Sequence, residues 1–398
     1  MDAVALTDQQ RLVRDGVREL CAAFGDDYWR ERDAEGEYPH EFADALAEAG
    51  YLGALVPEEY GGAGMATPEA AVMMETIAAA GGGFAAAQAV HGAVYNAVPL
   101  VEYGGDALKA DLLPKVAAGE ASVQAFGLTE PDAGSEATAI ATTAEPTDGG
   151  DTYRIEGQKV WTSRVDVSDY LVLMARTTPR EAVDRRTDGV TMFLVDLAAA
   201  HEQGAVELSP IDKTATRAVH AYELFIEGLE VPAGNVVGEV DEGFHQMLDG
   251  LNEERVVIAA ECVGLGRAAL GAAVEYAGER EVFGGPIGAN QAVQHPLAAA
   301  YAALRAARGV VYRAAERLGE VDRSAAGGDA NVAKYLAAEA AFEAADAAVQ
   351  THGGFGVARE YDVERYFREA RLTRLVPVTQ ELALNYVGEH VLGLPRSY

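Results

Sequence analysis

The sequence has few cysteines and histidines, and their spacing argues against metal and disulfide chemistry. Cys21 and Cys262 are the only two cysteines, and they form no C-x-x-C pair. The eight histidines are scattered without the short spacings that metal ligands usually show. We therefore expect no bound metal and no disulfide framework.

Positive charge is also scarce. The chain has 63 acidic residues against 31 basic ones, which gives a formal net charge of −32. Nucleic-acid binding requires a basic face, so this function class is excluded. The excess negative charge suits a protein that stays soluble in concentrated salt, where screening weakens self-repulsion. We therefore expect a halophilic source.

No targeting signal or membrane span is predicted. The N-terminal segment, residues 1–8, lacks the basic-then-apolar layout of a signal peptide. The weakly polar stretch at residues 76–90 is rich in alanine and glycine and too short to cross a bilayer. A cytoplasmic protein without a membrane partner is expected.

At 398 residues the chain is long enough for two or three domains. Helical patterns predict an all-helical N-terminal domain over 1–121, with a capping box at Thr7–Gln10. Short β-rich runs separated by turns predict a middle β domain over 122–232, an antiparallel barrel or sandwich. Long Ala-rich helical segments predict a C-terminal four-helix bundle over 233–398. The fold class is therefore mainly α with one β domain.

The individual elements follow from the same patterns. Helices are predicted at 38–50, 67–80, 84–101, 106–119, 243–279, 290–320, 325–350 and 379–392. Strands are predicted at 153–155, 170–174, 190–195 and 222–226.

Two segments of the middle domain suggest a binding site. Residues 127–136 contain Pro131, Gly134 and Ser135, which predict a tight turn. Such a turn offers backbone N–H groups and hydroxyls to a flat polar group or to a phosphate. Taken alone it could equally be an ordinary surface loop. The second segment, Lys159-Val160-Trp161-Thr162-Ser163, follows within thirty residues.

With five further segments, this pair resembles the signature of the acyl-CoA dehydrogenase family. A single such motif is weak evidence, but seven in the same order along most of the chain are strong evidence. The further segments are Pro57–Gly64, Leu251–Arg255, Arg280–Gln291, Gln350–Gly356 and Arg359–Arg371.

The resemblance implies an FAD cofactor and assigns residues to it. Trp161 would lie against the flavin, and Ser163 would hydrogen-bond its reactive edge. The implied cofactor-binding residues of the chain are Phe126, Leu128, Thr129, Gly134, Ser135, Trp161, Ser163 and Thr379. Those implied to reach the FAD of a neighbouring subunit are Arg280, Phe283, Gln291, Gln350, Gly353 and Gly354. Ser135, Asn252 and Arg255 would contact the acyl-CoA.

Each of these residues also has a structural interpretation. Trp161 could be a core aromatic residue on a strand, and Arg280 could be a solvated helix residue. Gly353 and Gly354 could simply end a helix. The joint order of the motifs favours the binding roles.

The catalytic base departs from the commonest family pattern. Many members carry a glutamate after the closing helix, where this chain has Pro377. A second group, resembling the isovaleryl-CoA and long-chain dehydrogenases, places the glutamate immediately before the helix arginine, where this chain has Glu254. The alternative is that Glu254 is a solvent-facing acid like its neighbour Glu253. We take Glu254 as the base.

Pro377 bears on the substrate carbonyl as well. In the resembled family a backbone N–H at this position helps to hold the thioester oxygen, and proline has no N–H. Either the oxygen loses one donor, or a shifted backbone supplies the N–H of Val378.

The resemblance implies dehydrogenation of an acyl-CoA thioester to a trans-2-enoyl-CoA, with electrons passed to an electron-transfer flavoprotein. The cross-subunit contacts imply a homo-oligomer, expected to be a tetramer. Two alternatives remain open on the same fold: a desulfinase-like or oxidase flavoenzyme, and a non-catalytic protein that binds flavin or acyl-CoA.

Overall fold

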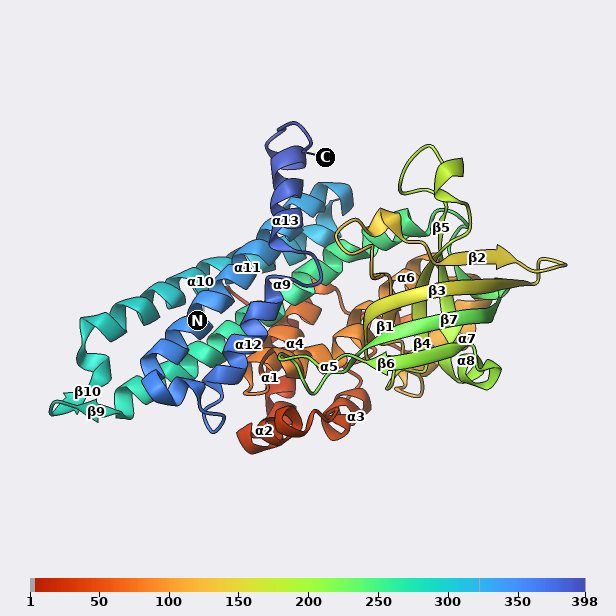
Figure 1. Ribbon diagram of the computed structural model, residues 1–398. Helices are drawn as coiled ribbons and strands as arrows, with labels where there is room; N and C mark the ends of the chain where they lie inside the picture. The colour runs from red at the N-terminus through yellow and green to blue at the C-terminus, as the bar shows by residue number, and fades with distance from the viewer. Residues whose placement is uncertain (1–3, 322, 398) are drawn as a thin grey trace.

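The structure is a computed structural model that describes residues 4–321 and 323–397 (Figure 1). Its first part is helical. The helices are α1 (Asp8–Cys21), α2 (Asp26–Glu35), α3 (His40–Glu48), α4 (Thr67–Ala79), α5 (Gly83–Tyr95), α6 (Ala97–Tyr103) and α7 (Asp106–Ala117).

Two local features of this part compare directly with the sequence. The capping box is confirmed, because Gln10 N–H donates to Thr7 Oγ1 and Thr7 N–H donates to Gln10 Oε1. The single helix predicted over 84–101 is wrong, since two helices meet at Asn96. The reason is Pro99, which has no N–H to donate to the carbonyl oxygen of Tyr95.

The middle part forms one sheet of eight strands in the described chain. The strands are β1 (Ala125–Gly127), β2 (Thr143–Pro146), β3 (Thr152–Ser163), β4 (Tyr170–Arg176), β5 (Val190–Asp196), β6 (Val206–Pro210), β7 (Ala221–Pro232) and β8 (Val236–Val237). Their order is β6-β7-β3-β2-β4-β5-β8, with β1 paired in parallel to β4. Strands β4 and β5 are buried along almost their whole length, which explains their nearly unbroken apolar sequences. The short helix α8 (Leu197–Gln203) follows β5.

The last part is a bundle of long helices that extends away from the sheet (Figure 1). Its elements are α9 (Gly243–Glu279), a hairpin of β9 (Glu281–Val282) and β10 (Gly285–Pro286), α10 (Gln291–Glu320), α11 (Arg323–His352), α12 (Val363–Thr373) and α13 (Gln380–Tyr386), which a π-helical turn (Val387–Val391) follows.

Helix α9 is the central helix of the molecule. It packs against α4, α5, α10 and α11, so it joins the N-terminal helices to the bundle. It is also the one helix of the described chain that is long and apolar enough to cross a membrane, yet 78% of its most apolar window is buried inside the protein. Packing within the bundle therefore accounts for its apolar sequence.

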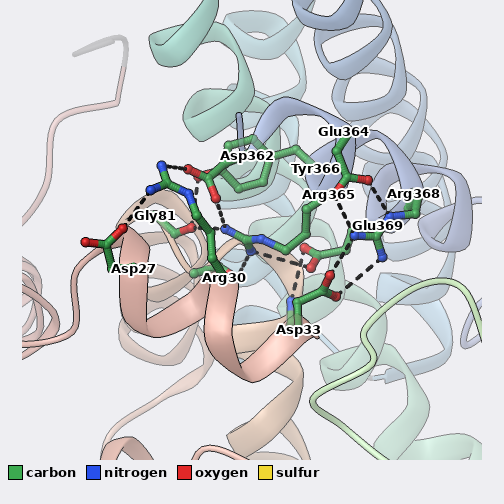
Figure 2. A network of polar contacts seen from close by, with 12 residues as sticks. Asp27, Arg30, Asp33, Gly81, Asp362, Glu364, Arg365, Tyr366, Arg368 and Glu369 are labelled. Carbon is green, nitrogen blue, oxygen red and sulfur yellow. Dashed lines mark hydrogen bonds and ion pairs between the residues drawn. The ribbon is translucent and has the colours of Figure 1, made fainter. Parts of the chain in front are cut away.

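Helix α12 fastens the bundle to the N-terminal helices through a buried polar network (Figure 2). Arg365 donates to two carbonyl oxygens of the turn before α5, at 2.8 and 2.9 Å. Glu369 Oε2 accepts a hydrogen bond from Phe84 N–H, at the start of α5, at 2.7 Å. Arg368 pairs with Asp33 of α2 at 2.7 Å. Residues of the Arg359–Arg371 segment thus hold the start of α5 in place.

Candidate active site

Trp161 is exposed because a bulge interrupts β3. The register of β3 with β7 shifts between Lys159 and Thr162, and Trp161 has a φ of 62°. Bulky residues avoid this left-handed region. The side chain of Trp161 is 56% exposed, whereas that of Thr162 is buried. The interpretation of Trp161 as a core aromatic residue is therefore wrong, and its strained, exposed position is typical of a functional residue.

The loop after β1 is tied to β3 by a buried ion pair. Lys159 is fully buried, and its Nζ lies 2.7 Å from Glu130 Oε1 and 3.1 Å from Leu128 O. Burial lowers the pKa of Lys159 to about 8, although Glu130 opposes this shift. The backbone adds a second link, because Val160 N–H donates to Thr129 O at 2.9 Å. Thr129 is therefore held beside the strand that carries Trp161.

The other residues predicted in these two segments lie around this link. Phe126, Leu128, Thr129 and Ser163 are half-buried, and Gly134 and Ser135 are exposed.

Arg164 connects the end of β3 to the helices. It follows Ser163, and its buried guanidinium donates to Gln88 O at 2.7 Å and to Gln124 O at 3.2 Å. Gln88 belongs to α5, so the end of β3 lies against the middle of this helix. His91 lies about one turn further along α5.

Helix α9 brings Glu254 to the same place. Glu254 is 5% exposed, and its Oε1 lies 3.8 Å from His91 Nε2. Two turns further along α9, Glu261 Oε1 lies 2.7 Å from His91 Nδ1. Tyr95 of α5 also faces this group, and burial together with the Glu254 carboxylate raises the pKa of Tyr95 well above its ordinary value. Glu254 is therefore not the solvent-facing acid of the alternative interpretation.

One oxygen of the Glu254 carboxylate is left without a hydrogen-bond partner in the described part of the chain. Within the described residues, Glu254 Oε2 has no hydrogen-bond partner although it is buried. Such an atom is costly unless a ligand or water satisfies it. Among the same residues, no group of three His, Cys, Asp or Glu side chains is placed to hold a metal ion. The exposed Trp161 ring, the half-buried hydroxyl of Ser163 and this free carboxylate oxygen fit a flavin with an organic substrate.

The residues implied to reach a neighbouring subunit lie elsewhere, at what we call the outer end of the bundle. Arg280 follows α9, Phe283 lies in the β9–β10 hairpin and Gln291 begins α10. Figure 1 shows this hairpin at the opposite side of the molecule from the sheet. All three residues are exposed, and Phe283 is exposed completely. A single chain therefore does not bring them to Trp161 or Glu254.

The glycine-rich segment lies at this outer end as well. Gln350, Gly353 and Gly354 are exposed, at and just after the end of α11. Tyr276, one turn before the end of α9, stacks on His352 with ring centroids 4.2 Å apart. An apolar hollow of about 490 Å³ opens between α9, β10 and α10. The outer end thus combines a hollow with an exposed set of polar residues and one aromatic residue.

Comparison with known proteins decides the family. Models of the N-terminal, middle and C-terminal domains of acyl-CoA dehydrogenases match residues 7–120, 125–229 and 241–392. Acyl-CoA dehydrogenase FadE12 of Mycobacterium tuberculosis is 36% identical over 392 residues, which cover 98% of each chain. The chain belongs to the acyl-CoA dehydrogenase family.

Solved structures of acyl-CoA dehydrogenases agree over the whole length. Butyryl-CoA dehydrogenase from Megasphaera elsdenii is similar with a TM-score of 0.90 and 30% identity, over 98% of this chain and all of the other. A glutaryl-CoA dehydrogenase in complex with glutaryl-CoA is similar with a TM-score of 0.88 and 31% identity, over 100% and 98% of the two chains. The predicted family and fold class are confirmed, and with them an oxidoreductase of a flavoprotein family.

The remaining predicted residues lie on α9 and next to the start of α13. Asn252 is buried on α9, and its Oδ1 accepts a hydrogen bond from Arg255 at 3.1 Å. Thr379 caps α13, because its Oγ1 accepts from Leu382 N–H at 3.3 Å. Its hydroxyl proton remains able to donate to a cofactor. Pro377 is exposed in the segment between α12 and α13.

Four residues of the site were not anticipated from the sequence: His91, Tyr95, Arg164 and Glu261. Two signals could have indicated them. His91 and Tyr95 are polar residues four apart in an otherwise apolar helix, and Glu261 lies seven residues after Glu254 on the same helix face. The sequence contains no signal that these two helices meet.

Proposed function

We propose that this member of the acyl-CoA dehydrogenase family converts an acyl-CoA thioester to a trans-2-enoyl-CoA, with FAD as cofactor and Glu254 as the base. The observation that carries the proposal is the buried Glu254 carboxylate with its free Oε2, reached from the Trp161 strand through Arg164 and α5. The names of the butyryl-CoA and glutaryl-CoA relatives support an acyl-CoA substrate.

In this mechanism Glu254 takes the proton from the α-carbon of the thioester. The pair of electrons left by that proton forms the new double bond, while the β-carbon loses a hydride. When bound, FAD supplies the hydride acceptor for this step. The burial of Glu254 excludes water from the carboxylate, and Tyr95 and His91 restrict its orientation.

Residues from two chains would hold the FAD. Within one chain, Trp161, Ser163 and Thr129 would contact the flavin, since they lie together around the β3 bulge. Thr379 and the loop with Gly134 and Ser135 would hold its remaining parts and the CoA. The outer end of the bundle would supply Arg280, Phe283, Gln291, Gln350, Gly353 and Gly354 to a second chain.

The exposed residues of the outer end support an oligomer, and we propose a homotetramer. Phe283 lies in full contact with solvent beside the apolar hollow. At a separate place, toward the C-terminus (Figure 1), Leu384, Val391 and Leu392 of α13 and the turn that follows it are also exposed. Large apolar side chains exposed in this way support the presence of protein interfaces.

The family resemblance and the charge of the chain also suggest an electron acceptor, a cellular location and a salt environment. We propose an electron-transfer flavoprotein as acceptor and a cytoplasmic location. The formal net charge of −32 favours a salt-rich environment, in which the thermal stability of the protein would rise with KCl concentration. A protein that melts at the same temperature in low and high salt would contradict this last point.

An anaerobic panel of acyl-CoA substrates tests the proposed function. The purified protein should be yellow, with one FAD per chain, and an accepted acyl-CoA should bleach the flavin and yield the trans-2-enoyl-CoA. Activity that survives Glu254→Gln would support the desulfinase-like reaction, which needs no α-proton base. An absence of bleaching across the panel would support the non-catalytic alternative. Bleaching with reoxidation by air during turnover would support the oxidase.

A further inference from the structure

A buried chain of three ionisable side chains extends behind the proposed base. His91 lies between two carboxylates of α9, with Nε2 at 3.8 Å from Glu254 and Nδ1 at 2.7 Å from Glu261. We infer that His91 is a positioning residue: as an imidazolium held by Glu261, it keeps Glu254 ionised and oriented for proton abstraction. The inference rests on the proposed function, because it takes Glu254 as the base.

Glu261 fixes the position of the imidazole. It is completely buried, and both of its oxygens are engaged, one by His91 Nδ1 and the other by Gln88 Nε2 at 2.7 Å. A carboxylate bound to one ring nitrogen of a histidine sets the orientation of the ring and the direction of the other nitrogen. Here the other nitrogen, Nε2, has no hydrogen-bond partner among the described residues and lies within ion-pair distance of Glu254 Oε1, at 3.8 Å. The arrangement is therefore built to act on Glu254.

The two carboxylates beside the ring favour a protonated His91. The titratable groups around the cluster are Tyr95 from α5, Glu254, Arg255 and Glu261 from α9, Arg164 after β3 and Tyr38 before α3. The guanidinium groups of Arg164 and Arg255 act on the same carboxylates, but Glu261 contacts the ring directly, with its Oε1 2.7 Å from Nδ1. Burial lowers the pKa of His91, but Glu261 and Glu254 outweigh burial and raise it. A buried charge persists only when it is paired.

The consequence for catalysis concerns the acidic side of the pH profile. A carboxyl group in an apolar site tends to hold its proton, and a protonated Glu254 cannot take another. An imidazolium 3.8 Å from Glu254 Oε1 attracts the negative charge of the carboxylate and so opposes this tendency. Without His91, the rate of α-proton abstraction should fall at a higher pH than in the wild type.

The test is the pH dependence of anaerobic flavin bleaching by an accepted acyl-CoA. In His91→Gln, the pH below which the bleaching rate falls (the acidic limb of the profile) should rise by about one pH unit or more. At alkaline pH the rate should return to within a few-fold of the wild type. Glu261→Gln should shift the limb in the same direction by a smaller amount. His245→Gln is the matched control, because His245, near the start of α9, also pairs with a carboxylate, that of Asp188 before β5, at 3.2 Å, and is nine residues from Glu254.

A second measurement requires no turnover. Because the folded pKa of His91 is raised, its stabilising effect is complete below the ordinary pKa of histidine and is lost as the pH rises through the folded value. The difference in Tm between wild type and His91→Gln should therefore shrink as the pH rises above about 6.5.

The outcomes separate the inference from the proposed function. An active Glu254→Gln would remove the base assignment itself. An inactive Glu254→Gln, with an unmoved acidic limb in His91→Gln, would overturn only the role of His91. A uniform loss of rate at every pH would show that His91 is merely structural. If His91→Gln fails to fold, the pH profile of Glu261→Gln provides the test. An acidic limb shifted to higher pH would support the role of His91, and an unmoved limb would overturn it.

Discussion

The middle and the end of α9 carry two different kinds of site. In the first half of the helix and at its midpoint, Glu254 and Glu261 are buried and face His91, Tyr95 and other groups of the same chain. Beyond its end, Arg280 and Phe283 are exposed to solvent. The buried region is surrounded by distant segments of one chain, and the exposed region presents residues for another chain. Substitutions in the buried region should therefore change stability and chemistry, and those in the exposed region should change assembly and cofactor retention.

The largest stability effect should come from Lys159→Met, on β3, the strand that carries Trp161. Removing the cation leaves the Glu130 carboxylate buried without its counter-ion, although the N–H groups of Ala141 and Thr142 still donate to it, so the free energy of unfolding should fall by about 3 kcal/mol. Denaturant unfolding of the purified protein measures this. Lys115→Met is the control, because Lys115 and Asp111 form an exposed pair, and it should cost less than about 1 kcal/mol. Equal losses in the two variants would show that burial of the Lys159 pair is not the cause.

Glu369→Gln should alter how stability depends on pH. Burial raises the pKa of Glu369 to about 7, although Arg365 opposes it. The folded protein therefore binds this proton more tightly than the unfolded chain. The stability that the protonated carboxyl provides is present at low pH and is lost as the pH rises toward 7. Glutamine cannot titrate. As the pH rises toward 7, the free energy of unfolding of the variant should therefore increase relative to that of the wild type by up to about 1.4 kcal/mol per pH unit. Melting curves from about pH 5 to 8 measure the difference, and a constant difference would contradict the raised pKa.

Arg280→Ala should leave the chain folded but weaken its assembly. Arg280 is exposed, so the melting temperature of the separate chain should change little. Loss of a charged hydrogen bond to the cofactor of another subunit should cost about 1.5–3 kcal/mol, roughly 10- to 100-fold in FAD affinity. Flavin content and light scattering during gel filtration measure both effects. A variant that is monomeric yet holds FAD as tightly as the wild type would refute the cross-subunit role.

The smallest effect should come from Thr379→Ala, which removes the cap of α13. Loss of an N-cap hydroxyl costs about 1 kcal/mol of stability. Thr379→Ser keeps the hydroxyl and should restore most of it. A loss of FAD from Thr379→Ala with Tm unchanged would instead indicate that the hydroxyl serves the cofactor rather than the helix.

Local patterns were sufficient for much of the fold. The helix predicted at 243–279 has the bounds of α9, because a long helical pattern without proline covers the whole segment. The capping box at Thr7 depends on residues three apart, so the sequence contains all of it. Motif order indicated Trp161 and Glu254, and their contrasting exposure in the structure agrees with the roles proposed for them.

Features that depend on distant contacts were not predicted. Helix α2 is rich in charged residues and lacks a clear apolar face, and it is held by Trp29 in the core and by ion pairs with α12. His91 and Glu261 stand 170 residues apart in the sequence and meet only through the packing of α5 on α9. The residues that surround the base therefore could not be predicted from local sequence patterns, whereas the base itself could be proposed from its motif.

The most direct test of the account compares Glu254→Gln with Glu253→Gln. Both changes replace a buried glutamate of α9 by its amide, and the two positions are adjacent in the chain. Glu254→Gln should stay yellow and bind acyl-CoA, but anaerobic bleaching of its flavin should slow by about 10³-fold or more because the base is gone. Glu253→Gln should bleach within a few-fold of the wild-type rate. Wild-type bleaching by Glu254→Gln would contradict the assignment of Glu254 and, with it, the proposed mechanism.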